Sequence, residues 1–236
     1  MRIEIWSDVV CPWCYIGKRR LERALAGFEH ADEVEVVYRS FELDPSAPRD
    51  STEPVVEVIA RKYGGGVDGA RQMLQRVSEV AAEEGLEYHL ERTLRGNTVD
   101  AHRLLHLALE QGGPRLQGEL KEALLAAYFT RTENVADHDV LRKVAADTGL
   151  DAARVEQMLG SQEFTDDVHA DVAQAQAFGA SGVPFFVVDR AYGVSGAQPV
   201  EVFADVLERA WAAAHPTLTV VGADQDAACG PDGCPV

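Results

Sequence analysis

Cys11-Pro12-Trp13-Cys14 joins a short apolar run to a long amphipathic segment near the start of the chain. Before it, Ile3 and Ile5 alternate with charged residues, a pattern typical of a β-strand. After it, apolar residues recur at helical spacing, namely Tyr15, Leu21, Ala24, Leu25 and Phe28. The cysteines are therefore expected where a strand passes into a helix, with Cys11 as the cap and Pro12 as the first helical residue.

This position favours redox chemistry at the two thiols. Unpaired amides and the positive end of a helix dipole stabilise an anion, so we predict an exposed Cys11 with an activated thiolate. The two residues between the cysteines bring Cys14 round to the sulfur of Cys11 on the first helical turn. The pair is thus expected to close a disulfide and to reopen it.

Length, composition and charge limit the class of protein. The chain has 236 residues, of which 46% are hydrophobic and 26% charged, as in an ordinary globular protein. Its formal net charge of −17 argues against nucleic acid or an anionic membrane as a partner, because both bind basic patches. We find no apolar run of roughly 20 residues and no signal peptide, and we expect a cytoplasmic protein. In that compartment a close cysteine pair is typically catalytic or metal-binding.

The remaining hydrophobic pattern predicts one more strand, a block of helices and a closing hairpin. Residues 33–43 alternate as a strand, and residues 54–178 show helical periodicity broken at glycines. Residues 184–188 and 192–195 form the expected hairpin, and a helix follows over 199–213. This order predicts an α/β protein with a thioredoxin-like sheet and an inserted helical domain.

The same pattern predicts how the chain is divided. Residues 1–45 and 161–215 are expected to form the thioredoxin-like domain, and residues 46–160 the inserted helical domain. Residues 216–236 change in composition to Gly, Ala, Asp and Pro, so we expect a flexible C-terminal tail there.

The tail supplies a second cysteine pair. Cys229 and Cys234 stand amid glycine and proline, at a spacing compatible with a small disulfide ring. A flexible segment of about eighteen residues spans on the order of 24 Å, against a radius of gyration of roughly 18 Å for a compact chain of this size. Two interpretations stay open: an incidental terminal pair, or an auxiliary redox pair that exchanges disulfides with the Cys11 site.

Ser181-Gly182-Val183-Pro184-Phe185 places a proline at the start of a buried strand, where it needs a structural reason. Together with the dithiol motif and the helical insertion, this segment resembles the DsbA family of thiol-disulfide oxidoreductases, specifically its cytoplasmic FrnE-like branch. The resemblance extends to Asp8, Asn97-Thr98, Ala101-His102-Arg103-Leu104 and Ser195-Gly196-Ala197-Gln198-Pro199. It implies a cis bond at Pro184 that faces the dithiol, and a Val183 backbone that pairs with an extended client segment.

The resemblance also implies a mechanism. Cys11 attacks a disulfide of a client protein or small molecule, and Cys14 then releases the mixed disulfide by attacking Cys11. The reverse sequence oxidises a client. Trp13 stands where DsbA-type enzymes often carry histidine, so we expect a less acidic Cys11 than in strongly oxidising members. No cofactor is expected besides the dithiol, with glutathione as a candidate co-substrate.

Several further side chains have two interpretations each. Asp8 either relays a proton for the dithiol or is a cap or turn residue. Asn97 and His102 either line the groove near the proline or serve as an ordinary cap and a helix-face histidine. His102 and His106 have the spacing of zinc ligands, but the Glu of His-Glu-x-x-His is missing, so no metal site is predicted.

Two other functions compete with that of a disulfide oxidoreductase or isomerase. One is a glutathione-dependent isomerase or transferase for a small organic substrate such as a polyketide, because related folds include 2-hydroxychromene-2-carboxylate isomerases and kappa-class glutathione transferases. Those relatives usually carry serine in place of Cys11. The other is a non-enzymatic module that binds a metal with all four cysteines. The client, the direction of electron flow and the oligomeric state stay open.

Overall fold

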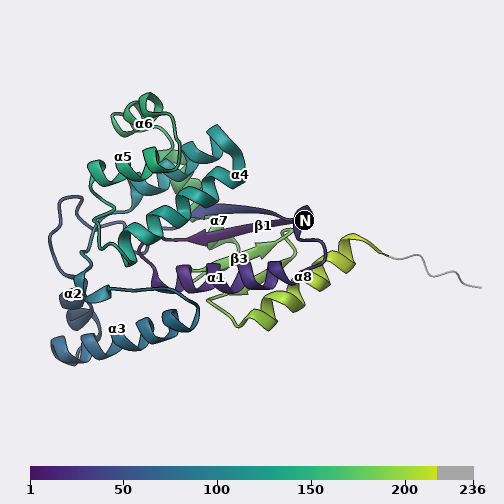
Figure 1. The fold of residues 1–236 in the computed structure, drawn as a ribbon, viewed down its shortest axis with the longest axis horizontal. Helices are drawn as coiled ribbons and strands as arrows, with labels where there is room; N and C mark the ends of the chain where they lie inside the picture. The colour runs from purple at the N-terminus through teal and green to yellow at the C-terminus, as the bar shows by residue number, and fades with distance from the viewer. Residues whose placement is uncertain (217–236) are drawn as a thin grey trace, which may run out of the picture.

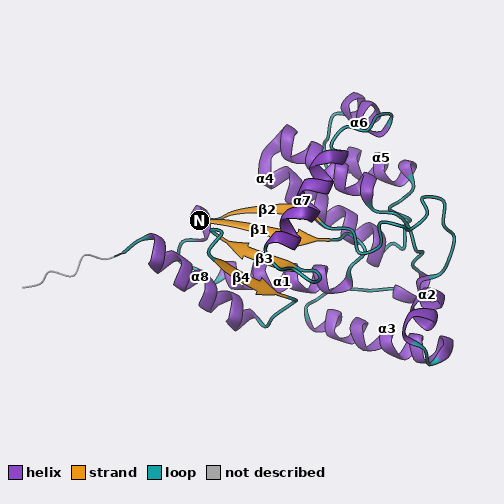
Figure 2. Ribbon diagram, turned by 180° about the vertical axis from the view of Figure 1, so that it is seen from behind, coloured by secondary structure: helices purple, strands orange, loops and turns teal. Residues whose placement is uncertain are grey.

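A computed structural model describes residues 1–216 of the protein. The described residues contain one mixed sheet, in which the strands lie in the order β2-β1-β3-β4 (Figure 2). The strands are β1 (Arg2–Ser7), β2 (Glu35–Ser40), β3 (Phe185–Val188) and β4 (Tyr192–Ser195). β1 is parallel to β2 and antiparallel to β3. The strand that leads into the dithiol therefore lies in the interior of the sheet.

Helices cover both faces of this sheet. On one face, α1 (Pro12–Ala26) and α8 (Val200–Ala214) pack side by side, and Leu21 and Leu207 join the apolar side chains of the strands (Figure 1). On the other face, α7 (Thr165–Ala177) packs against Trp6 and Val187. Because β1 is covered on both sides, even its Glu4 is buried, and the carboxylate pairs with arginines from neighbouring segments.

The chain between β2 and α7 forms a block of helices. These are α2 (Val55–Tyr63), α3 (Gly66–Glu83), α4 (Val99–Phe129), α5 (His138–Asp147) and α6 (Ala152–Leu159), with the short 3-10 helix η2 (Leu90–Arg92) before α4. Their apolar core includes Leu104, Leu120 and Leu124, and it also receives Tyr15 and Ile16 from the start of α1. The helical block is thereby packed directly onto the helix that carries the dithiol.

The predicted order of elements is confirmed, and the differences lie at their ends. The second strand is shorter than residues 33–43, because a 3-10 turn, η1 (Ala31–Glu33), precedes it and β2 ends at Ser40. The break expected at residues 112–114 is a kink inside α4, where Gly113 has a φ of 67°. Within residues 1–216, no helix combines the length and the apolar character needed to cross a membrane.

Candidate active site

The two cysteines of the dithiol lie where β1 passes into α1. Cys11 is the N-cap of α1 and Pro12 is its first residue, as the sequence predicts. Both thiols are free, and the Cys14 amide donates to the Cys11 carbonyl at 3.0 Å. Trp13 points outward and is 41% exposed, whereas Cys11 is 4% exposed. The prediction of an exposed Cys11 is therefore wrong.

A segment from the other end of the sheet covers this thiol. Cys11 Sγ donates to the Val183 carbonyl at 3.6 Å, across 172 residues of chain. The Val183–Pro184 peptide bond is cis, as the resemblance implies. From the helical block, the Tyr88 hydroxyl donates to the Pro12 carbonyl at 2.8 Å, which holds the turn between the cysteines. The dithiol is thus enclosed from both the sheet and the insertion.

The two thiols titrate as a pair. Burial raises the pKa of Cys14, but its contact with Cys11 and the charge of Lys121 outweigh burial and bring the pKa below its ordinary value. The hydrogen bond to Cys14, together with burial, raises the pKa of Cys11 well above its ordinary value. The two buried thiols thus titrate together, and the Lys121 ammonium supports a negative charge on the pair. An activated thiolate at Cys11 itself stays a prediction, because the titration of two coupled thiols belongs to the pair.

Lys121 is a site residue that the sequence pattern does not reveal. Its side chain is fully buried, and Nζ donates to the carbonyl of Ser7, the last residue of β1, at 3.2 Å. One turn earlier in α4, the Gln117 side-chain amide bonds both the amide and the carbonyl of Tyr38 in β2, at 2.8 and 2.9 Å. That clamp fixes α4 against the sheet edge and places Lys121 beneath the dithiol.

Burial dominates the electrostatics of this lysine. It lowers the pKa of Lys121 to about 8, although the nearby charges of Cys14 and Asp8 favour the ammonium form. The Lys121 ammonium is therefore positioned as a counter-ion for negative charge on Cys14. The sequence signal for a buried Lys121 was its spacing of four residues from Gln117, which places both side chains on one face of the helix. Leu116, Leu120 and Leu124 repeat at the same interval one position earlier, so the segment was interpreted as an ordinary amphipathic helix.

Asp8 and His102 form a second buried pair at the end of β1. Asp8 Oδ1 lies 3.3 Å from His102 Nε2, and Asp8 Oδ2 accepts the Leu43 amide at 2.8 Å. Burial raises the pKa of Asp8, but the contacts with His102 and the Leu43 amide outweigh it, so the pKa lies below its ordinary value. His102 Nδ1 has no hydrogen-bond partner among the described residues. The carboxylate of Asp8 is therefore charged and held beside the dithiol and Lys121.

The other predicted candidates lie away from the thiols. The Asn97 side chain accepts the Val99 amide at 3.0 Å and donates to the Pro45 carbonyl at 3.3 Å, so it starts α4 and ties down a loop. His106 contacts Ser40 and Asp171 rather than His102. Within the described residues, no group of three or more His, Cys, Asp or Glu side chains is arranged to hold a metal. The auxiliary pair, Cys229 and Cys234, lies outside the described residues.

Asp8→Asn is expected to lower stability in a pH-dependent way. A hydrogen bond to a charged group contributes about 1.5–3 kcal/mol, so we expect a loss of about 2 kcal/mol at pH 7. Because the pKa of folded Asp8 lies below 3.8, the contribution is complete above pH 3.8 and disappears as the pH falls through the folded value. Urea unfolding between pH 7 and pH 3 measures this, with exposed Asp50→Asn as the control. A difference that persists unchanged at pH 3 would contradict the assignment.

A dithiol on a helix cap opposite a cis-proline, set in a four-stranded sheet, defines a protein of the thioredoxin type. The family model of the DSBA-like thioredoxin domain matches residues 2–208. The chain therefore belongs to the DSBA-like thioredoxin family. Among curated proteins, the uncharacterized protein YwbO of Bacillus subtilis is 28% identical over 207 residues, which cover 86% of this chain and 94% of YwbO.

Solved structures extend the comparison. A probable DsbA oxidoreductase, SCO1869 from Streptomyces coelicolor, is 47% identical with a TM-score of 0.85, over 100% of this chain and 99% of SCO1869. The cytosolic disulfide reductase DsbM from Pseudomonas aeruginosa, solved with GSH, is 18% identical with a TM-score of 0.62, over 89% of this chain and 98% of DsbM. A 2-hydroxychromene-2-carboxylate isomerase is 13% identical with a TM-score of 0.65, over 91% of this chain and 98% of the isomerase. The last two share the fold.

Proposed function

We propose that the protein is a thiol-disulfide oxidoreductase or disulfide isomerase that works through Cys11 and Cys14. The observation that carries the proposal is a pair of free thiols at the N-terminus of α1, enclosed by Val183–Pro184 and placed over the buried Lys121. Membership of the DSBA-like family supports it, as does the likeness to a probable DsbA oxidoreductase. We further propose a cytoplasmic location, in line with the cytosolic DsbM.

The geometry suggests how the first exchange proceeds. As Cys11 Sγ attacks one sulfur of a client disulfide, its proton passes to the Cys14 thiolate. The client S–S bond breaks, and the second client sulfur leaves as a thiolate that takes a proton from solvent. A mixed disulfide now joins Cys11 to the client. The backbone of Val183 offers the client segment a pairing partner, as in strand addition.

The second exchange regenerates the disulfide of the protein. Cys14 loses its proton to solvent, because the Lys121 ammonium favours the thiolate. Cys14 Sγ then attacks Cys11 Sγ, the mixed disulfide breaks, and the client sulfur that was bound to Cys11 leaves as a thiolate that takes a proton from solvent. Two electrons have passed to the client, and Cys11 and Cys14 are joined. Asp8 supports the step by favouring the charged form of Lys121, which is an electrostatic role rather than a relay.

An isomerase acting with glutathione on a small organic substrate is the alternative. Its support is the fold shared with a 2-hydroxychromene-2-carboxylate isomerase and with the GSH-bound DsbM. The presence of both Cys11 and Cys14 favours disulfide exchange, since an isomerase of that kind needs no second thiol. Activity that survives Cys14→Ser would favour the isomerase. In the redox proposal, glutathione serves as the small thiol that reduces or oxidises the dithiol.

Equilibration with glutathione and glutathione disulfide tests the proposal. We expect one two-electron transition between the potentials of thioredoxin, about −270 mV, and DsbA, about −120 mV. We expect it closer to thioredoxin, because Trp13 adds no positive charge beside Cys11. The variant Cys229→Ser/Cys234→Ser separates this transition from that of the tail pair. If that variant forms no disulfide between Cys11 and Cys14 across this range, the proposed function is wrong.

A further inference from the structure

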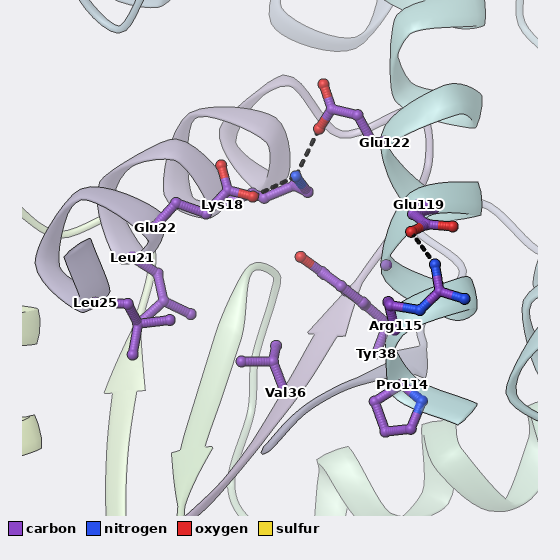
Figure 3. Close-up of a pocket in the computed structure, with 11 residues that line it drawn as sticks. Lys18, Leu21, Glu22, Leu25, Val36, Tyr38, Pro114, Arg115, Glu119 and Glu122 are labelled. Atoms are coloured by element: carbon purple, nitrogen blue, oxygen red, sulfur yellow. Dashed lines mark hydrogen bonds and ion pairs between the residues drawn. The ribbon is translucent and has the colours of Figure 1, made fainter. Parts of the chain in front are cut away.

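A cavity of about 510 Å³ lies between α1, β2 and the second half of α4 (Figure 3). Its walls are apolar and come from all three elements, namely Leu21 and Leu25 of α1, Val36 and the Tyr38 ring of β2, and Pro114 of α4. Cavities of roughly 300–1,000 Å³ with mostly apolar walls and few polar groups are typical of small-molecule sites. The cavity therefore has the size and lining of a ligand site.

The sequence of α4 contributes to the shape of this cavity. The helix kinks at Gly113, so the segment that follows Pro114 takes its own direction across the edge of β2. Gly118 then lines the cavity, and a Cβ built there would lie 4.0 Å from the Tyr38 ring. A larger side chain at this position would extend into the space. The kink and the missing side chain together help to keep the cavity open.

One polar group is directed into this apolar space. Tyr38 is 7% exposed, and its hydroxyl makes no hydrogen bond to any of residues 1–216. Figure 3 shows the hydroxyl pointing into the cavity beneath Lys18. Burial, together with the charges of Glu22 and Glu122, raises the pKa of Tyr38, so the hydroxyl keeps its proton and acts as a donor. A ligand that offers an acceptor oxygen would satisfy it.

The charges at the mouth are already paired. Lys18 Nζ lies 2.5 Å from both Glu22 and Glu122, and Arg115 lies 2.5 Å from Glu119 (Figure 3). A charged ligand would have to break the pairs of the buried Lys18 or bring an unpaired charge against apolar walls, which is costly. Because the charged side chains at the mouth are already paired and the Tyr38 hydroxyl is a neutral donor, the cavity favours a neutral ligand.

We propose that this cavity binds a neutral, largely apolar small molecule with a carbonyl or ether oxygen that accepts a hydrogen bond from the Tyr38 hydroxyl. The site is separate from the dithiol. The Tyr38 ring lies between the cavity and Lys121, whose Nζ is 5.7 Å from the ring centre, and Lys121 in turn faces Cys14. The ligand thus occupies the space behind the dithiol, where no client disulfide meets Cys11, and its binding does not depend on the proposed redox function.

Titration of the full-length protein with 2-acetonaphthone, followed by calorimetry or ligand-observed NMR, tests the site. We expect one saturable site per chain. Tyr38→Phe should weaken binding about fivefold, the usual loss for one neutral hydrogen bond. Gly118→Leu should abolish binding by filling the cavity. Tyr192→Phe on β4, which removes a hydroxyl elsewhere, should leave the affinity unchanged.

Two further comparisons make the result decisive. The anion 2-naphthoate, with a similar shape, should bind at least tenfold more weakly, because its charge finds no free partner. Cys11→Ser should bind 2-acetonaphthone as the wild type does, whether or not the protein proves to be redox-active. The proposal is overturned by an absence of saturable binding, by equal affinity in Tyr38→Phe and the wild type, or by loss of binding in Cys11→Ser. If Gly118→Leu fails to fold, Tyr38→Phe alone decides.

Discussion

Cys14→Ser is expected to stop turnover and to leave the protein joined to its client through Cys11. Without the second thiol, the Cys11 proton passes to solvent and the first exchange still proceeds, but the mixed disulfide has no internal nucleophile to break it, so the second exchange stops. Incubation of the reduced variant with insulin or glutathione disulfide, followed by non-reducing electrophoresis and mass spectrometry, should show one adduct per chain at Cys11. Catalysed insulin reduction should fall to the uncatalysed rate.

Cys11→Ser is the matched control for this experiment. It also removes turnover, but it should form no adduct at Cys14, because it is Cys11 Sγ that contacts the Val183 carbonyl, where we propose that the client segment binds. Both variants are made with Cys229 and Cys234 replaced by serine, so that adducts at the tail are not counted. Adducts at Cys14 in Cys11→Ser, in amounts equal to those at Cys11, would contradict the assignment of Cys11 as the attacking thiol.

Lys121→Met leaves both cysteines in place. It is nevertheless expected to slow the release of the client from the mixed disulfide by about tenfold at pH 7. Loss of the buried ammonium raises the pKa of Cys14, and a rise of one unit reduces the thiolate fraction about tenfold below the pKa. The release rate of the variant should therefore keep rising with pH after that of the wild type has levelled off. Rapid mixing of the preformed mixed disulfide between pH 6 and pH 10 measures this profile.

The free energy of unfolding of Lys121→Met distinguishes an electrostatic role of Lys121 from a structural one. Burial lowers the pKa of Lys121 from 10.5 to about 8, which corresponds to a cost of about 3 kcal/mol for keeping the ammonium in the folded protein at pH 7. Lys121→Met should therefore be at least as stable as the wild type in urea while releasing clients more slowly. Lys143→Met removes the same charge from the surface of α5 and should change neither property. A Lys121→Met profile that matches the wild type would remove Lys121 from the mechanism.

The fold and half of the site were predictable because they depend on local patterns. Alternation and helical spacing identified the order of the elements, and Pro12 marked the first residue of α1. Motif and position together predicted Cys11 and Cys14 as the candidate redox pair, and the segment around Pro184 was predicted to face them, which is where the structure places it. Burial and charge at the thiols were predicted less well, because the Val183 carbonyl and Lys121 reach them from distant parts of the chain.

The sequence by itself determined which thiols are present, that two residues separate them at the start of a helix, and which fold carries them. Only the tertiary structure decided how those thiols ionise. Helix-cap geometry acts within one turn and favours an anion at Cys11, whereas the packing of α4 against β2 brings a buried ammonium to Cys14. In a low-dielectric interior a nearby full charge acts more strongly than the partial charge of a helix end, so the Lys121 ammonium lowers the pKa of the buried Cys14.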